Sequence, residues 1–252
     1  MKVYVINLKH STDRKAYMQE LLQPYSFLDV EFVEAIDGRC LSDTDKAKMF
    51  NIEKANSRYG RYLSDGEIGC TLSHQLCYQK LINDKDDIAL ILEDDLIISE
   101  NHIDTILRNL ENVLKEYSNI PIILLLSGDY WWTKVDRKIE NFSLVSVYDA
   151  SCSQSYIINK KAALRMRNKH PFFLADDWLY YKRKTKIKAV YPHLMDQNRV
   201  DFSTLVIANN IGIVRKGLSL SRNLFYYKNA IIKKILCKFN HFESKRFKNG
   251  IA

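Results

Sequence analysis

Short runs of apolar residues, several rich in β-branched side chains, recur along this chain. Runs of this length with few polar interruptions are typical of strands buried on both faces of a sheet. The predicted strands cover residues 2–8, 30–33, 88–92, 122–126, 142–147, 156–158 and 187–190. The run at 88–92, with the sequence IALIL, is the most continuous of them.

Helices are predicted between the strands. The clearest covers residues 65–83, where Ser64 and Glu67 have the spacing of a capping box and Leu72 lies in an apolar stripe at helical spacing. Further helices are predicted over 11–22, 43–54, 102–117, 160–167 and 176–184, and the Arg- and Tyr-rich stretch after residue 54 is expected to be an exposed loop.

Strands that alternate with helices predict an α/β layer structure with a largely parallel central sheet flanked by helices. Neither an internal repeat nor a linker divides the chain. We therefore expect one domain over residues 1–221, followed by a tail over residues 222–252.

The tail differs from the rest of the chain in charge and pattern. Of the formal charge of +8, residues 222–252 supply +7, with eight basic residues and one acidic residue. The predicted helix over residues 224–242 has an apolar face formed by Ile231, Ile232, Ile235, Leu236, Phe239 and Phe242. Its basic face is formed by Lys233, Lys234, Lys238, His241 and Lys245. Such a helix is typical of binding to an anionic membrane surface. The alternative is a helix that packs its apolar face on the domain.

Composition narrows the class of protein further. Apolar residues make up 46% of the 252 residues, which is too many for a disordered chain. No apolar run approaches the ~20 residues of a membrane span. Five cysteines without a CxxC pair, and an N-terminus without a cleavable leader, predict free thiols and a cytoplasmic protein. A nucleic-acid partner is not expected, because the excess of basic residues is confined to one amphipathic helix.

Three consecutive acids, Glu93, Asp94 and Asp95, directly follow the run at 88–92. Ligands of open α/β sheets gather at the carboxyl ends of strands, and adjacent carboxylates repel one another unless a cation lies near them. Oxygen ligands of this kind suit Mg²⁺ or Mn²⁺, which often bridge a carboxylate to substrate phosphates. The acids therefore predict a metal and phosphate site. The alternative is a solvated acidic turn.

Five motifs occur in the order KVYVINLKHSTDR at 2–14, AIDG at 35–38, LSDGEIGCTLSH at 63–74, ALILEDD at 89–95 and DDW at 176–178. Together they resemble glycosyltransferase family 25, which includes bacterial lipooligosaccharide galactosyltransferases, and the resemblance spans residues 2–205. It implies a GT-A-like fold and a metal-dependent, inverting reaction. The enzyme would transfer a hexose, with galactose as the first candidate, from a UDP-sugar to a lipooligosaccharide or lipopolysaccharide acceptor. Such an acceptor would place the enzyme peripherally at the inner membrane.

Two alternatives remain. One is a glucosyltransferase of the same family. The other is a nucleotidyltransferase on a similar sheet, although the glycine-rich phosphate loop expected of that class is absent from the sequence.

The resemblance also implies roles for single residues. The donor pocket would be lined by Ile6, Asn7, Leu8, Arg14, Ala35, Asp37, Gly38, Ser73, His74, Glu93 and Asp94. The metal, Mn²⁺ or Mg²⁺, would be held by Asp95, Glu93 and His193.

The second acidic motif would supply catalysis. Asp177 would take the proton of the acceptor hydroxyl as general base, and Asp176 would orient the acceptor or the base. Contacts with the acceptor are expected from Trp178, Tyr156, Trp131 and Gln197. For Gln197, and for Ser203 as a further candidate, a contact with the phosphates is the alternative.

One other pattern indicates a different metal. Glu67, Cys70, His74 and Cys77 lie on one stripe of the 65–83 helix, and thiolate and imidazole ligands are typical of zinc. Four ligands on one helix over three turns cannot surround a single ion tetrahedrally. Cys70 and Cys77 are therefore expected to be small core residues.

Overall fold

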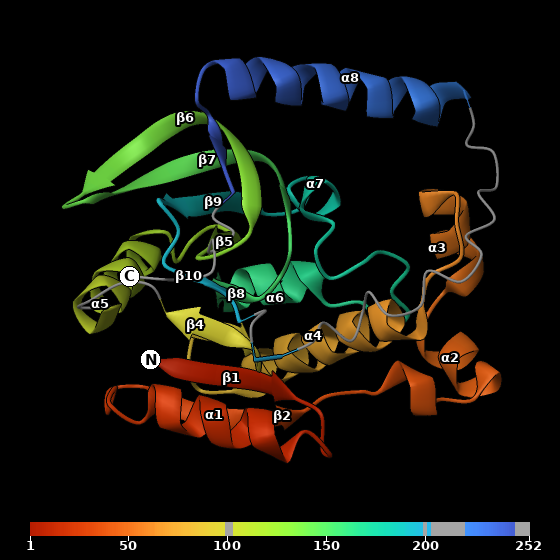
Figure 1. Cartoon of the computed structure of the whole chain (residues 1–252), viewed down its shortest axis with the longest axis horizontal. Coiled ribbons are helices and arrows are strands. Elements are labelled where there is room, and N and C mark those ends of the chain that lie inside the picture. The colour runs from red at the N-terminus through yellow and green to blue at the C-terminus, as the bar shows by residue number, and fades with distance from the viewer. Residues whose placement is uncertain (99–102, 199–200, 203–219, 245–252) are drawn as a thin grey trace.

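A nine-stranded sheet runs through the protein in the computed structural model, which describes residues 1–98, 103–198, 201–202 and 220–244 (Figure 1). In spatial order its strands are β11 (Phe242–Glu243), β6 (Asp129–Ile139), β7 (Phe142–Ser151), β9 (Lys186–Tyr191), β5 (Ile122–Leu125), β8 (Ser155–Asn159), β3 (Ile88–Glu93), β1 (Lys2–Asn7) and β2 (Asp29–Glu34). Every strand predicted from an apolar run is present.

The predicted α/β layer structure is confirmed, but the prediction of a largely parallel sheet is wrong, because the sheet is mixed. Parallel pairing joins β1 to β2 and to β3, and β5 to β9. In contrast, β8 lies antiparallel between β3 and β5, and β7 lies antiparallel between β6 and β9. The tight connection between β6 and β7 allows only antiparallel pairing.

The β6–β7 hairpin contains the aromatic residues 130–132, among them Trp131 of the predicted acceptor contacts. These residues lie near the start of β6, in which Tyr130 and Trp132 are buried. The rest of the strand is largely exposed and polar, and it pairs with β7 through three register shifts. A strand exposed on both faces has no apolar alternation, so its signal in the sequence is weak.

Alternate residues of β1 show how the two layers of helices meet the sheet. Val3 and Val5 pack in one core with α1 (Thr12–Leu22) and α5 (Ile103–Glu116). Tyr4 and Ile6 pack in the opposite core with α4 (Asp65–Asn83), α6 (Lys160–Met166) and α7 (Trp178–Tyr181). This alternation is the period of two that a strand buried on both faces requires.

Local capping explains where the smaller helices begin and end. The helix predicted over 43–54 is divided into α2 (Asp43–Met49) and α3 (Ile52–Tyr59) at Phe50, which is fully buried. Ser42 caps α2, and Asn51 caps α3 by accepting from the Lys54 N–H. The stretch expected to be an exposed loop after residue 54 therefore belongs partly to α3. A short 3-10 helix, η1 (Gly38–Cys40), follows β2.

A second, two-stranded sheet lies next to the acids. β4 (Leu96–Ile98) pairs antiparallel with β10 (Met195–Gln197). This pairing places Gln197 opposite Leu96, one residue after Asp95.

The predicted tail helix is present as α8 (Leu220–Lys238), which lies along the hairpin at the top of Figure 1. Asn229 accepts from the Tyr148 hydroxyl at 2.6 Å, and Lys233 pairs with Asp149. After the helix, β11 adds to the edge of the sheet and Phe242 stacks on Trp131. The prediction of one apolar and one basic face is therefore only partly correct, because polar residues make much of the contact with the hairpin.

The exposed side of α8 carries the remaining apolar residues. Leu224, Tyr227, Ile231, Ile235 and Phe239 are between 48% and 70% exposed. Ile232 and Leu236 are half-buried, and Lys245 lies outside the described residues. None of the described helices is both long and apolar enough to cross a bilayer. All five cysteines are free, as predicted.

Candidate active site

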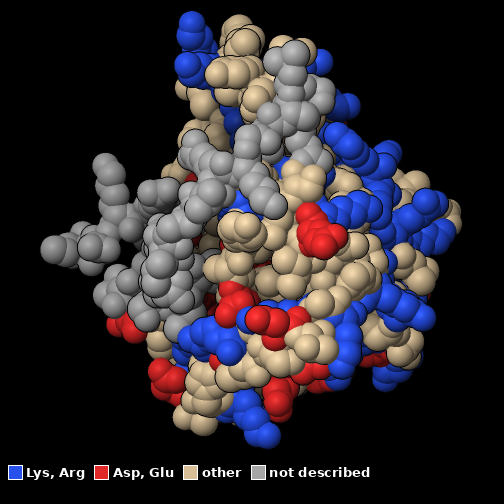
Figure 2. Space-filling view, turned by 90° about the vertical axis from the view of Figure 1, so that its right-hand side faces the viewer, with Lys and Arg blue, Asp and Glu red and all other residues tan. Residues whose placement is uncertain are grey.

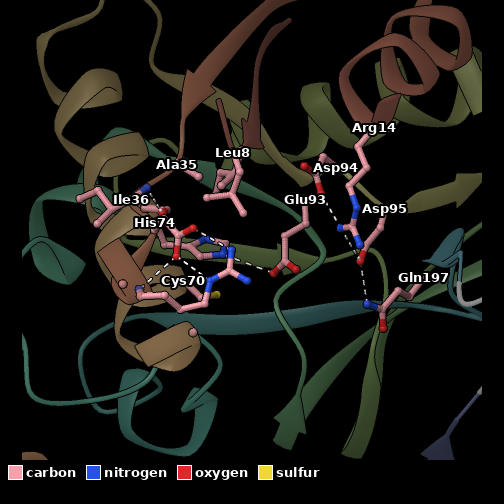
Figure 3. A pocket seen from close by; sticks show the side chains of 16 residues that line it. Leu8, Arg14, Ala35, Ile36, Cys70, His74, Glu93, Asp94, Asp95 and Gln197 are labelled. Atoms are coloured by element: carbon pink, nitrogen blue, oxygen red, sulfur yellow. Dashed lines mark hydrogen bonds and ion pairs between the residues drawn. The ribbon is translucent and has the colours of Figure 1, made fainter. Parts of the chain in front are cut away.

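The acids at the end of β3 lie beside the end of β1, because the two strands are parallel neighbours whose carboxyl ends meet at one edge of the sheet. Asn7 donates from Nδ2 to Asp94 at 2.7 Å. Arg14 of α1 donates from Nη1 to Asp94 Oδ1 at 2.9 Å and lies 3.4 Å from Asp95 Oδ2 (Figure 3). One guanidinium therefore serves two carboxylates.

Asp95 is buried without enough partners for both of its oxygens. It is 4% exposed, and its Oδ2 accepts from Gln197 Nε2 at 2.8 Å. Its Oδ1 has no hydrogen-bond partner in the part of the chain that the structure describes. Burial, followed by the charge of Glu93, raises the pKa of Asp95 to about 6. Burial likewise raises the pKa of Asp94 despite its contact with Arg14.

A cavity opens beside these acids. Its lining consists of Ile6, Leu8, Arg14, Ala35, Ile36, Asp37, Gly38, Arg39, Gly66, Cys70, Ser73, His74, Glu93, Asp94, Asp95 and Gln197. Every residue predicted for the donor pocket lines it except Asn7, which lies behind Asp94. The structure therefore brings together residues from four separate motifs, as the resemblance implied.

The wall opposite the acids is the loop after β2, which lies directly against α4. A Cβ atom on Gly38 would lie 1.9 Å from the Asp65 carbonyl oxygen, and one on Gly69 would lie 2.5 Å from that of Ile36. Ser73 Oγ accepts from the Ile36 N–H at 2.9 Å. Only glycine allows this approach of the backbones, which holds the wall in place.

Two polar contacts complete this wall. Arg39 donates to Asp37 at 2.8 Å and lowers the pKa of that carboxyl to about 2. The predicted capping box of Ser64 and Glu67 is present at the start of α4, and Glu67 also pairs with Arg61.

Glu93 faces α4 from the end of β3. It accepts from the Ser153 hydroxyl at 2.8 Å, and His74 Nε2 lies 3.4 Å from its Oε1. Burial opposes ionisation of Glu93, but the contacts with His74 and Ser153 outweigh it and lower the pKa. Cys70 lies one turn before His74 and lines the same cavity (Figure 3).

The acidic pair before α7 has two different environments. Asp177 Oδ2 accepts from Arg58 Nε at 2.8 Å and from the Tyr59 hydroxyl at 2.7 Å. Its Oδ1 caps α7 by accepting from the Tyr180 N–H. Asp176 Oδ2 accepts from the Cys152 N–H at the longer distance of 3.3 Å. Burial, with the charges of Glu93 and Asp177, raises the pKa of Asp176.

The residues predicted to contact the acceptor do not form one group. Tyr156 and Trp178 are fully buried and pack edge to face, so neither ring offers a free surface to a sugar. Trp131 lies under the tail, between Phe242 and Lys233. Gln197 contacts Asp95 and so belongs to the acidic cluster.

Two more predicted residues lie elsewhere. His193 is 1% exposed and lies 3.9 Å from Asp196, and it does not line the cavity beside Asp95. Ser203 lies outside the described residues.

Several residues of the site were not predicted. Arg58 and Tyr59 hold Asp177, and the cluster of arginine and tyrosine around residue 60 was the available signal. Ser153, which donates to Glu93, has no signal in the sequence. Its position depends on the turn between β7 and β8.

Known proteins similar to this chain agree on a family. The model of glycosyltransferase family 25, described as an LPS biosynthesis protein family, matches residues 1–177. Procollagen galactosyltransferase 2 of Homo sapiens is 26% identical over 176 residues, or 68% of this chain and 28% of the human protein. A glycosyltransferase 25 family member of Aedes aegypti is 37% identical over 98 residues, or 37% of this chain and 16% of that protein.

This chain thus spans less than a third of the length of either relative. Among solved structures, UDP-glucose pyrophosphorylase complexed with UDP-glucose is 10% identical, with a TM-score of 0.41 over 78% of this chain and 90% of that one. That likeness is too distant to indicate a function. The family match covers more than half of the chain together with the motifs that line the cavity, and the chain belongs to glycosyltransferase family 25.

Proposed function

We propose that this chain transfers a hexose from a UDP-sugar to a lipooligosaccharide or lipopolysaccharide acceptor, with inversion at the anomeric carbon. Galactose is the first candidate for the transferred sugar. The cavity at the ends of β1 and β3 is the observation that carries the proposal. Its apolar residues Ile6, Leu8 and Ala35 suit a nucleoside, and its acids suit a diphosphate bound through a cation. The family description supports the acceptor, and the names of the relatives support galactose.

The acidic cluster fits a divalent cation. The Oδ1 atom of Asp95 is buried without a hydrogen bond from the described residues, and among those residues Arg14 is the one that forms ion pairs with Asp94 and Asp95. Asp95 and Glu93 would hold Mn²⁺ or Mg²⁺, and a bound cation would neutralise the charge of the leaving diphosphate. We omit His193 from the proposed ligands because it lies beside Asp196 and away from the cavity.

We assign the general base to Asp176, whereas the sequence favoured Asp177. Three hydrogen bonds or ion pairs hold Asp177, so its lone pairs are already committed to Arg58, Tyr59 and the first turn of α7. Asp176 keeps a raised pKa and lies close enough to Glu93 for their charges to interact. A carboxylate with a raised pKa accepts a proton more readily at neutral pH. Asp177 then acts as a positioning residue.

Turnover with purified chain tests the proposal. With Mn²⁺ and a lipooligosaccharide acceptor, we expect UDP-galactose to give UDP and a galactosylated product, with UDP-glucose as the competing donor. The Asp95→Asn variant should lose turnover, whereas Asp86→Asn, a half-exposed acid away from the cavity, should keep it. Release of pyrophosphate from UTP and a sugar phosphate, without sugar transfer, would instead indicate a nucleotidyltransferase.

We also propose that α8 holds the enzyme peripherally on an anionic membrane such as the cytoplasmic face of the inner membrane. The exposed apolar stripe, Leu224 to Phe239, shares this side of the helix with exposed lysines that include Lys228, Lys234 and Lys238. In Figure 2, basic side chains lie on both sides of uncharged ones at the top, where α8 lies. An exposed apolar stripe with basic flanks suits an interfacial helix.

Vesicle sedimentation tests the membrane proposal. Each basic residue near an anionic surface contributes ~1 kcal/mol, so the double variant Lys234→Glu/Lys238→Glu should bind phosphatidylglycerol vesicles at least ~30-fold more weakly. The matched control Lys85→Glu/Lys161→Glu makes the same charge change at exposed positions outside the tail. Equal binding by the two variants would contradict a role for α8.

A further inference from the structure

Three potential metal ligands converge in the lining of the cavity. The sulfur of Cys70, a ring nitrogen of His74 and a carboxylate oxygen of Glu93 all lie within 4.8 Å of one another. Cys70 and His74 are one turn apart on α4, and Glu93 reaches them from β3 (Figure 3). Ligands on one helix alone cannot surround an ion, but here the third ligand comes from a strand on another side of the site.

The orientation of His74 suits a ligand. Its Nδ1 lies 2.7 Å from the Tyr156 hydroxyl, which in turn lies 3.0 Å from the Tyr78 hydroxyl. When Tyr156 donates to Tyr78, its oxygen accepts the Nδ1 proton of His74. The lone pair of Nε2 then points toward Glu93, as in metal sites where a hydrogen bond from the second nitrogen orients the imidazole.

The surroundings favour a positive charge at this point. In the other tautomer, Nε2 carries the proton and donates to Glu93 Oε1 across 3.4 Å, which is the contact that lowers the pKa of Glu93, so a cation at this point would take the place of that proton. Burial, followed by the charges of Glu93 and Asp176, raises the pKa of the Cys70 thiol, and a cation would offset these negative charges. A cation between Cys70, His74 and Glu93 would replace this long contact and the thiol proton with three bonds.

We propose that Cys70, His74 and Glu93 form a binding site for a thiophilic divalent cation of the Zn²⁺ class, with a fourth position open to the cavity. Sulfur and imidazole select such ions over Mg²⁺, and binding releases the thiol proton to solvent. Ligand atoms around tetrahedral zinc lie roughly 3.5 Å apart, so the side chains need only small inward movements.

The site bears on the proposed function through Glu93. Because Glu93 is also a proposed ligand of the donor-site cation, Zn²⁺ bound to Cys70 and His74 withdraws it from that role. We therefore expect Zn²⁺ to inhibit sugar transfer supported by Mn²⁺. This consequence rests on the proposed function, whereas the metal site itself does not.

Co²⁺ titration of the full-length chain tests the site without any reference to activity. The wild type should bind Co²⁺ with a near-ultraviolet thiolate-to-cobalt charge-transfer band and visible bands of tetrahedral cobalt, and Zn²⁺ should displace it. The Cys70→Ser variant should lose the thiolate band. The control Cys40→Ser, which removes an exposed thiol away from Glu93, should keep it.

A second variant separates this site from a binding site made only of carboxylates. Tyr156→Phe removes the hydroxyl that orients His74 and leaves all three ligands, so Zn²⁺ affinity should fall ~10–100-fold. A spectrum without a thiolate band, or one that is unchanged in Cys70→Ser, would overturn the proposal. Zinc binding without inhibition of transfer would leave the site intact and remove only its link to the donor pocket.

Discussion

This protein has two acidic clusters, Glu93 to Asp95 and the Asp176–Asp177 pair. Each is a run of adjacent carboxylates, but the two differ in how their negative charges are paired. In the first, Arg14 is shared between Asp94 and Asp95, and an oxygen of Asp95 has no partner among the described residues. In the second, Arg58 serves Asp177. Adjacency of acids therefore does not define a role. The cations and donors around each carboxylate decide whether it binds, holds or reacts.

Within the second cluster, the largest effect on rate should come from Asp176. Asp176→Asn removes the proposed base and should lower kcat ~10²–10⁴-fold, the usual contribution of general base catalysis, with little change in the KM for the donor. Steady-state kinetics with saturating acceptor measure this split. If Asp177→Asn lost kcat to that extent while Asp176→Asn did not, the assignment of the two acids would be reversed.

The next effect concerns stability rather than rate. Asp177→Ala removes the cap of α7 and leaves the half-buried Arg58 without its carboxylate, so we expect a loss of ~2–4 kcal/mol in the free energy of unfolding. Asp177→Asn retains the cap and should lose less. Urea unfolding monitored by circular dichroism compares the two variants. If Asp177→Ala were as stable as wild type, the ion pair with Arg58 and the cap of α7 would not contribute to the free energy of unfolding.

Removing the charge of Asp95 should have the opposite effect from removing that of Asp177, because it should stabilise the folded protein. Its folded pKa of about 6 lies above the ordinary value of 3.8, so the native state is favoured while Asp95 is protonated and loses stability as the pH rises through 6. With EDTA present, Asp95→Asn should therefore gain ~2–3 kcal/mol relative to wild type between pH 4 and pH 7. Thermal unfolding at both pH values measures this difference. If the difference in stability between Asp95→Asn and wild type were the same at pH 4 and pH 7, the buried charge of Asp95 would not destabilise the folded protein.

The smallest effect is on the pH profile. Because the pKa of Asp176 is raised, kcat/KM should fall on the acid side with an apparent pKa above that of an ordinary aspartate. Asp177→Asn removes one nearby negative charge and should shift this limb to lower pH. A profile that is identical in wild type and Asp177→Asn would place the titrating group elsewhere.

Local patterns predicted those parts of the fold that local interactions determine. The bounds of α4 follow from its capping box and apolar stripe, and β3 follows from a run that is buried in any sheet. The hairpin β6–β7 was not predicted as a pair, because its exposed half carries little apolar signal. The direction of β8 depends on pairing between distant segments, which periodicity does not encode.

The candidate site divides in the same way. Residues of four motifs line one cavity, since each motif lies near the end of a strand or the start of α4, and their role in donor binding stays a prediction. The partners of Asp177 come from α3, more than a hundred residues earlier in the chain, and no spacing rule connects them. Tyr156 and Trp178 were expected to contact the acceptor, but both rings are buried in the core. Sequence type alone could not show which aromatic rings face solvent.

Calorimetric titration of UDP into the full chain, with Mn²⁺ or with EDTA, tests most directly whether the cluster at the end of β3 binds the donor through a cation. A metal–phosphoryl contact contributes several kcal/mol, so we predict that UDP binds at least ~10-fold more weakly in EDTA. Asp95→Asn should abolish this dependence on metal, whereas Asp176→Asn should retain it. Equal affinity for UDP in Mn²⁺ and in EDTA, unchanged by Asp95→Asn, would contradict the proposed donor site.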